Sequence, residues 1–282
     1  MNRLPLQKRV QILHMLVEGS SMRAISRVVG CSINTVTKLL VDAGNTCAEF
    51  HDQMVRGLTA RRVQCDEIWS FCYSKQKNTP DHKKDEAGDV WTWTAIDADS
   101  KLICGWMVGD RNAETASFFM QDLASRLAGR VQLTTDGHKA YLVAVEGAFG
   151  ADIDYGMLVK MYGTPPEAEK RYSPPEIVAC AKSVITGKPD SKHISTSYVE
   201  RQNLTMRMSM RRFTRLTNGF SKKLENHCHA LALYFVYYNF VRIHKSLRVT
   251  PAMEAGLVAS PMDLEDIVRM IDEREARLQE SN

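Results

Sequence analysis

The stretch VQCDEIWSFCY, residues 63–73, is rich in the β-branched and aromatic residues that favour strands. It is followed by VWTWTAI at residues 90–96, in which side chains alternate well, and by an apolar run over residues 102–108. The turn sequence DADS, residues 97–100, separates the last two stretches. We therefore predict three strands, of which the last two form a hairpin.

Helices and further strands alternate after this hairpin. The spacing of apolar residues predicts a helix over 113–127, a short strand over 131–135, a helix beginning near His138 and a strand over 153–161. Two long helical patterns follow, over 197–217 and 221–241. Strands interleaved with helices favour an α/β fold in which one sheet is covered on both faces.

Proline marks the segment 162–195. Five of the nine prolines in the chain lie there. Because proline lacks a backbone donor and fixes its own φ angle, we expect a long irregular insertion in this segment.

Residues 1–45 read as three short helices, the last two of which have the helix-turn-helix pattern. Ser21 and Ser32 are the expected N-caps, and Gly44 is expected to close the third helix. The residues expected to face a DNA groove are Asn34, Thr35, Thr37 and Lys38. A three-helix bundle without a nucleic-acid role is the alternative, and residues 46–61 form a partly helical connector.

The charge of the chain is unevenly distributed. Of its 282 residues, 37 are basic and 33 acidic, a net charge of +4. Residues 1–62 carry 9 − 4 = +5, residues 200–223 carry 7 − 1 = +6, and residues 262–282 carry 3 − 7 = −4. Clustered positive charge is typical of a protein that binds a polyanion. No run of 18 apolar residues is present, so no membrane span is predicted.

Three carboxylates occupy positions from which they can converge. Asp66 lies within the first predicted strand, Asp136 directly follows the short strand 131–135, and Glu200 lies early in a long helix. Gathering like charges is costly unless divalent cations neutralise them. Oxygen ligands suit Mg²⁺ or Mn²⁺, and two such ions can catalyse phosphoryl transfer.

The sequence around these acids resembles the DDE transposases of bacterial insertion sequences. The motifs are Asp66-Glu67-Ile68-Trp69, Thr135-Asp136-Gly137 and Glu200-Arg201-Gln202-Asn203, and they are most similar to the branch called insertion sequence one. The segment 237–252, which contains YYNFVRIHKSL, is similar to the end of many integrase-type catalytic domains. The resemblance covers residues 62–256.

The resemblance implies a ribonuclease-H-like mixed sheet flanked by helices. The small all-α helix-turn-helix domain predicted for residues 1–45 precedes it. The resemblance also implies two Mg²⁺ or Mn²⁺ ions bound by Asp66, Asp136 and Glu200. The implied partners are the double-stranded DNA of element ends and target, and a second copy of the chain, since two ends are joined in one reaction. The expected place is the cytoplasm, at the nucleoid. The acidic segment 257–282 is expected to form a helical tail.

The spacing of residues near the three acids suggests which of them support the site and which contact DNA. Side chains alternate along a strand, so Glu67 is expected to support the site rather than to point into it. His193 and Arg201 are further candidates for supporting residues. The residues expected to contact the DNA backbone are Asn203, Arg207, Arg211, Arg212, Arg215, Lys222 and Lys223.

Two other functions stay open at this point. One is a helix-turn-helix regulator that binds DNA without catalysis. The other is a ribonuclease-H-like nuclease that cleaves DNA without strand transfer.

Overall fold

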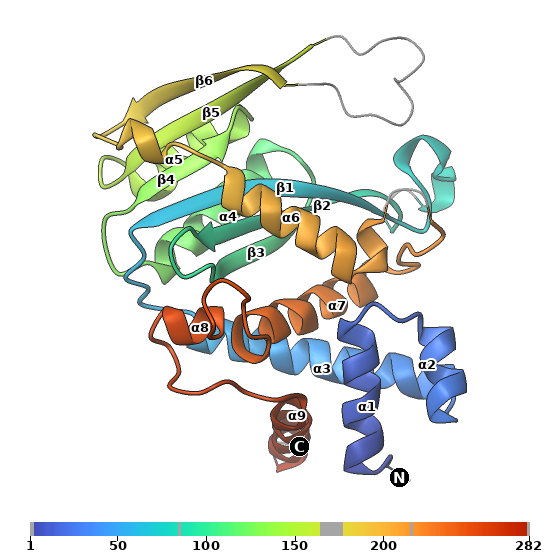
Figure 1. The fold of residues 1–282 in the computed structure, drawn as a ribbon. Helices are drawn as coiled ribbons and strands as arrows, with labels where there is room; N and C mark the ends of the chain where they lie inside the picture. Colours follow the sequence, from blue (N-terminus) through green and yellow to red (C-terminus); the bar gives the residue numbers. More distant parts are fainter. Residues whose placement is uncertain (1–2, 84–85, 164–176, 215–216, 281–282) are drawn as a thin grey trace.

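Six strands form one mixed sheet, and the N-terminal helices and the C-terminal helix lie below it in the view of Figure 1. The computed structural model describes residues 3–83, 86–163, 177–214 and 217–280. The strands lie in the order β3-β2-β1-β4-β5-β6. Their bounds are β1 (Arg62–Cys72), β2 (Gly88–Asp97), β3 (Ile103–Gly109), β4 (Gln132–Asp136), β5 (Asp154–Tyr162) and β6 (Ile177–Thr186).

Strand β1 joins the antiparallel and parallel parts of this sheet. It pairs antiparallel with β2 from Val63↔Asp97 to Cys72↔Gly88, and parallel with β4 from Arg62↔Gln132 to Cys65↔Thr135. β3 extends the antiparallel side, and β5 pairs parallel with β4. This order and these directions are those of a ribonuclease-H-like sheet, so the predicted fold class is confirmed.

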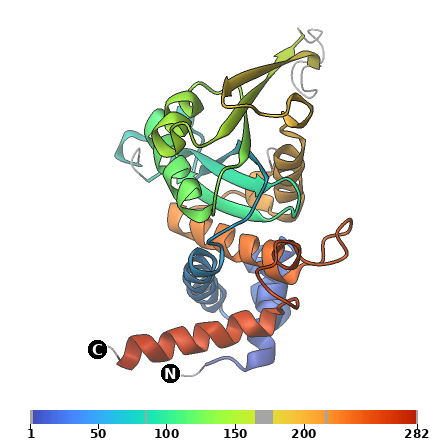
Figure 2. The same cartoon turned by 90° about the vertical axis from the view of Figure 1, so that its left-hand side faces the viewer.

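Helices cover both faces of the sheet. Figure 2 shows α4 (Ala113–Arg126) and α5 (Ala140–Phe149) on one side and α6 (Ser197–Ser209) on the other. Cys65 and Ile68 of β1 face opposite ways and are both fully buried, as expected for a strand between two layers. The short helical elements are η1 (Gln76–Asn78), η2 (Asp81–Lys83), η3 (Ser191–His193), η4 (Arg211–Phe213), η5 (Tyr237–Val241) and α8 (Pro251–Glu254).

The N-terminal helices are α1 (Leu6–Val17), α2 (Met22–Val29) and α3 (Ile33–Met54). The predicted caps form: Ser21 accepts a hydrogen bond from the amide of Ala24 at 3.1 Å, and Ser32 accepts one from the amide of Asn34 at 3.2 Å. α2 and α3 are inclined at 114°. This angle lies in the range of a helix-turn-helix motif, and the DNA-binding role of the two helices stays a prediction.

The third helix is longer than predicted. Gly44 does not close it, because α3 continues to Met54 through the predicted boundary at residue 45 and most of the connector 46–61. Gly44 lies instead against His229 of α7 (Leu224–Val236), at a place where only a residue without a side chain fits. Packing of α3 on α7 thus overrides the helix-ending tendency of glycine.

The prediction of an irregular insertion over residues 162–195 was wrong for the part that forms a strand. Residues 177–186 form strand β6, which pairs antiparallel with β5 from Tyr155↔Thr186 to Tyr162↔Ile177. Four of the five prolines of this segment fall within residues 164–176, outside the described residues, and Pro189 follows the strand. The prolines therefore flank β6 rather than interrupt it.

The acidic tail is helical, as predicted, and it packs on the N-terminal helices. α9 (Leu264–Glu280) lies beside α1 and α3 (Figure 2). Asp272 pairs with Arg3 and Arg9, and Glu275 pairs with Arg3 and, at 3.5 Å, with Lys38. The tail thus neutralises part of the positive charge of the first segment.

Among the described residues, no single helix is both long and apolar enough to cross a membrane. The bent pair α2–α3 meets these requirements of length and composition only when its two helices are taken together.

Replacing Gly44 with alanine tests the contact between α3 and α7. The added Cβ would lie 2.3 Å from the Cβ of His229, so we expect a loss of about 2–3 kcal/mol in the free energy of unfolding, measured with urea. Gly147 is the matched control, because it lies in α5 with nothing within 4 Å of an added Cβ. Gly147→Ala should gain about 0.5–1 kcal/mol. Equal stability of the two variants would contradict the close contact.

Candidate metal centre

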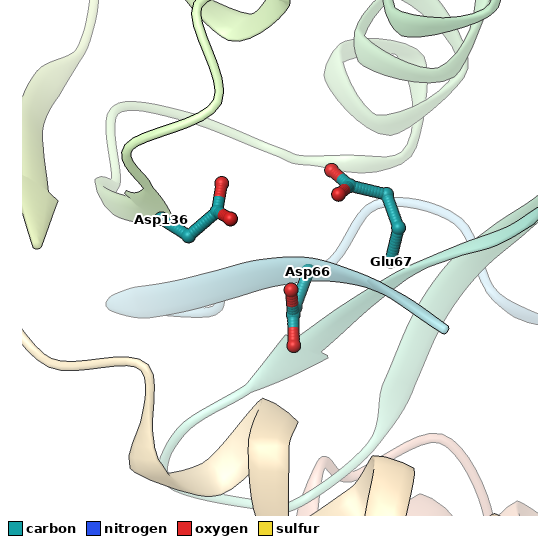
Figure 3. Close-up of side chains that lie close together, drawn as sticks. All are labelled: Asp66, Glu67 and Asp136. Atoms are coloured by element: carbon teal, nitrogen blue, oxygen red, sulfur yellow. The ribbon is translucent and has the colours of Figure 1, made fainter. Parts of the chain in front are cut away.

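Two parallel strands bring three carboxylates together. β1 carries Asp66 and Glu67, and β4 ends at Asp136. Because Cys65 is in register with Thr135, the next residues of the two strands, Asp66 and Asp136, are neighbours. One carboxylate oxygen from each of Asp66, Glu67 and Asp136 lies within 4.8 Å of the others (Figure 3).

Asp66 faces helix α6. Its carboxylate Oδ2 accepts a hydrogen bond of 2.8 Å from Nδ2 of Asn203, a buried residue of α6. Burial raises the pKa of Asp66 to about 7, and the neighbouring Glu67 and Asp136 carboxylates add to the rise. A group with this pKa is only partly ionised at neutral pH, and its charge would be favoured by a bound cation.

Glu67 points to the opposite side of β1, as the pleat predicts (Figure 3). Its side chain is only 1% exposed and accepts a hydrogen bond of 3.0 Å from Nε of Arg111. Burial raises the pKa of Glu67, while the Tyr141 hydroxyl and the Arg111 guanidinium lower it in part. An oxygen of Glu67 nevertheless lies within 4.8 Å of oxygens of Asp66 and Asp136. Its supporting role stays a prediction.

Asp136 lies where β4 ends and the chain turns towards α5. Its Oδ1 accepts a hydrogen bond of 2.9 Å from the backbone amide of His138, which fixes the carboxylate at the turn. Its Oδ2 lies 3.5 Å from Nη2 of Arg111. About a third of the Asp136 side chain is exposed, so this carboxylate can be reached from solvent.

Arg111 was missed by the sequence analysis. It follows β3, contacts both Glu67 and Asp136, and lies with its guanidinium 5.0 Å from the ring centre of Trp91. No local pattern identifies it, because the residues it contacts are 44 and 25 positions away in the sequence. It provides the positive charge that partly balances the cluster.

Glu200 lies apart from the three clustered carboxylates. It is on α6, one turn before Asn203, and its carboxylate accepts hydrogen bonds from Lys160 of β5 and from Thr196. Its charge still contributes to the raised pKa of Asp66. The assignment of Glu200 as a metal ligand stays a prediction.

The remaining residues predicted near the site are spread along β1 and α6. Asn203 reaches Asp66, as described above. His193 instead lies beside Arg62 at the beginning of β1, with Nδ1 of the histidine 2.6 Å from Nη1 of the arginine. Arg201 is exposed on α6, and Arg207 is half-buried one turn beyond Asn203.

The predicted DNA-contacting residues occupy two surfaces. Asn34 and Lys38 are exposed and Thr35 is half-buried, whereas Thr37 lies against Met22 of α2, with its hydroxyl 3.6 Å from the sulfur. Lys38 is also paired with Asp42 at 2.6 Å. Arg211, Arg212, Lys222 and Lys223 lie together after α6, and Arg215 is outside the described residues.

Comparisons with known proteins gave only distant similarities. No family model matches the chain, and no curated protein matches it. Among solved structures, the chain is similar to piggyBac transposase in a synaptic complex with hairpin DNA, with 10% identity, a TM-score of 0.43 and coverage of 94% of this chain and 69% of that chain.

Two structures of Mos1 transposase are also similar. The paired-end complex with the left transposon end has 12% identity and a TM-score of 0.22 over 55% of this chain and 60% of that chain. The strand transfer complex has 11% identity and a TM-score of 0.25 over 83% and 78%. At these values the similarity supplies no residue correspondence and does not single out a branch of insertion sequences.

The donor set of the cluster fits a divalent cation. Asp66, Glu67 and Asp136 offer only oxygen atoms, which are the ligands that Mg²⁺ and Mn²⁺ prefer. The raised pKa of both Asp66 and Glu67 means that the ionised cluster is unfavourable, and a divalent charge would remove this cost. Arg111 supplies one positive charge to the other two acids, while Asp66 accepts from the neutral amide of Asn203.

The pH dependence of stability tests the environment of Asp66. Its pKa is higher in the folded chain than in the unfolded chain, so its contribution to stability is complete below about pH 4 and is lost as the pH rises through about 7. Asp66→Asn removes this loss and can still pair with Asn203. With a chelator present, we expect the variant to exceed the wild type in unfolding free energy by about 1 kcal/mol or more at pH 8, but not at pH 4.

Asp99→Asn is the matched control, since a hydrogen bond from Arg62 lowers the pKa of Asp99. This variant should lose stability at pH 7 relative to the wild type and match it at low pH. In addition, Mg²⁺ or Mn²⁺ should raise the melting temperature of the wild type at pH 8 and not that of Asp66→Asn. An Asp66→Asn variant less stable than the wild type at pH 8 would contradict the proposed environment.

Proposed function

We propose that this chain is a DNA transposase, which cleaves DNA at the ends of a mobile element and transfers the freed 3′-hydroxyl to target DNA. The observation that supports the proposal is the gathering of Asp66, Glu67 and Asp136 oxygen atoms where β1 and β4 run side by side. Gathering three partly or fully buried acids is unfavourable for stability alone, so the cluster indicates a chemical role. The fold also resembles that of transposase catalytic domains.

The proposed metal ligands are Asp66 and Asp136, with Glu200 as the third acid. Two Mg²⁺ or Mn²⁺ ions would supply an activated water or hydroxyl and would stabilise the leaving oxygen of the phosphodiester. Asn203 orients Asp66 by its hydrogen bond, and Asn203 and Glu200 share one face of α6. Lys160 pairs with Glu200 and would have to give up this contact when Glu200 binds a cation.

Arg111 and Glu67 support the site in this proposal. The guanidinium of Arg111 holds Glu67 and lies beside Asp136, and 37% of the arginine side chain is exposed. A planar guanidinium in this position suits the non-bridging oxygens of a phosphate. Arg111 is therefore proposed to orient the scissile phosphate while Glu67 holds the arginine in place.

The proposed partners are double-stranded DNA and a second copy of the chain. The helix-turn-helix formed by α2 and α3 would bind the element ends through Asn34, Thr35 and Lys38. Two ends have to be joined in one reaction, so the working form is proposed to be at least a dimer. The proposed place of action is the cytoplasm, at the nucleoid.

Cleavage and joining assays on labelled duplexes test this function. The duplexes are taken from the DNA that flanks the coding sequence on both sides, and they are incubated with the protein and Mg²⁺ or Mn²⁺. A transposase gives nicked ends and products joined to target DNA. Nicking without joined product would indicate a nuclease, and binding without any cleavage would indicate a regulator; either result would overturn the proposal.

Single substitutions assign the ligands. Asp66→Asn, Asp136→Asn and Glu200→Gln should each reduce cleavage at least a hundredfold, because each removes a charged ligand, while binding of the duplex stays within threefold. Glu114→Gln, on the exposed first turn of α4, is the control and should cleave normally. If a variant cleaves within tenfold of the wild type, the substituted residue is not a metal ligand. If Glu67→Gln abolishes cleavage while Glu200→Gln retains it, Glu67 rather than Glu200 is the third acid.

A further inference from the structure

A second site lies between the N-terminal helices and the segment that joins α6 to α7. A cavity of about 960 Å³ is formed there by the end of α1, the beginning of α2, one side of α3 and residues 210–234. None of the clustered carboxylates lines it. Its volume is at the upper end of the range for sites that bind small organic ligands.

The charged residues that line this cavity are all basic. They are Arg23, Arg211, Arg212, Lys222 and Lys223, and no aspartate or glutamate is found among the described lining residues. Arg23 comes from the first basic segment of the sequence and the other four come from the second. The fold therefore joins the two basic segments into one surface that favours an anion.

Arg212 has an incomplete set of partners. Its guanidinium donates a hydrogen bond to the Ser221 hydroxyl, and in the described part of the chain it forms no ion pair with a carboxylate. Burial lowers the pKa of Arg212 to about 10. The imidazole of His227, on the far side of Ser221, is kept neutral because burial lowers its pKa to about 3. A partly buried guanidinium whose hydrogen-bond partner is neutral and whose charged neighbours in the cavity are basic is unfavourable unless an anion joins it.

Much of the remaining wall of the cavity is apolar. Leu16 of α1, Leu40 of α3, Met210 and Leu233 line it, and Phe220 lies there with its ring 4.9 Å from that of Phe71. A bare anion would leave this apolar surface uncovered. A ligand that combines a phosphate with a flat, weakly polar ring system would cover both parts.

We propose that this cavity binds a nucleotide unit, with its phosphate at Arg212, Lys222 and Lys223 and its base against the apolar wall. The chemistry of the cavity fits a free nucleotide as well as one unit of a DNA strand. The choice of a DNA strand as the source rests on the proposed function. Thr37, which is predicted to face a DNA groove, lines this cavity, so α3 contributes to the site.

Binding measured without divalent metal tests this site separately from catalysis. Fluorescence anisotropy with a labelled single-stranded oligodeoxynucleotide is carried out in chelator on the full chain in the Asp66→Asn background. Arg212→Met should weaken binding at least tenfold, because it removes the charge and keeps most of the volume. Arg269→Met is the control, since Arg269 lies on α9 and pairs with Glu265. Arg212→Met with unchanged affinity would overturn the proposal.

The melting temperature separates binding from a structural role of Arg212. Without ligand, Arg212→Met should melt at the same temperature as the wild type or higher, because an unpaired, partly buried charge is removed. A clearly lower melting temperature would make Arg212 a structural partner of Ser221 and overturn its role as a phosphate ligand.

The double variant Lys222→Ala, Lys223→Ala gives an independent measure of the phosphate contacts. The slope of log affinity against log salt concentration should decrease in magnitude by about 1.4, the value for two contacts to a single strand. An unchanged slope would contradict the phosphate contacts.

Competition identifies the source of the nucleotide. If only oligodeoxynucleotide displaces the labelled strand, the ligand is one unit of a strand; if thymidine 5′-monophosphate displaces it at similar concentration, the ligand is a free nucleotide. Inorganic phosphate that competes as well as the mononucleotide would overturn the role of the apolar wall. These binding experiments involve no cleavage. A negative result for the cavity therefore does not affect the proposed function, and a negative result in the cleavage assay does not affect the proposed nucleotide site.

Discussion

The repulsion among three carboxylates at the junction of β1 and β4 is the constraint around which the molecule is organised. Asp66 and Glu67 follow one another on a strand buried on both faces, and Asp136 is placed beside them by the parallel register. Each acid has a different neighbour that offsets its charge: the Asn203 amide for Asp66, the Arg111 guanidinium for Glu67, and the His138 backbone amide for Asp136. These neighbours come from α6, from the end of β3 and from the turn after β4. The electrostatic repulsion within the cluster is thus offset by groups from three separate parts of the fold.

Strands β1 to β5 were predictable because their sequences contain the information locally. Runs of β-branched and aromatic residues end at turn sequences such as residues 97–100, and burial on both faces keeps the strands apolar. β6 was missed although its sequence, IVACAKSVIT, contains an apolar run over residues 177–181, because the prolines around it favoured an irregular insertion. Nearly all of its side chains are exposed in the structure. It is held at the edge of the sheet by its backbone pairing with β5. The apolar run was therefore the signal that could have identified this strand.

The errors in the helical part and at the site have tertiary causes. Gly44 is a helix-ending residue by its own tendency, and only the approach of His229 explains why α3 continues past it. The positions of Asp66 and Asp136 followed from the strands that carry them, but the place of Glu200 depends on Lys160 from a distant strand. Arg111 could not be found from the sequence for the same reason, because its contacts to Glu67 and Asp136 exist only after the hairpin β2–β3 has packed against β1.

The two basic segments of the sequence differ in how far their charge is balanced by acidic residues in the fold. Arg3, Arg9 and Lys38 of the first segment are paired with acids of α9, so their charge is largely balanced within the chain. Arg23 and the residues of the second segment that line the cavity have no such acidic wall among the described residues. The net charge of +4 therefore hides a division between a neutralised outer face and a basic inner cavity. Uncompensated positive charge, rather than total charge, indicates where an external anion would bind.

Strand β1 also connects this cavity to the carboxylates. Ser221, which accepts the hydrogen bond of Arg212, lies beside the end of β1: its carbonyl accepts a hydrogen bond of 2.7 Å from the amide of Tyr73. From Asp66 to Cys72 the strand advances six residues, or about 20 Å at the usual rise. One strand of a B-form duplex rises about 3.4 Å along the helix axis per phosphate, so roughly six nucleotides would cover this length along the axis. A DNA strand that occupied both the cavity and the carboxylate cluster would then be held at two points that β1 keeps at a fixed distance. The number of nucleotides between these two points would determine which phosphate lies at the carboxylates.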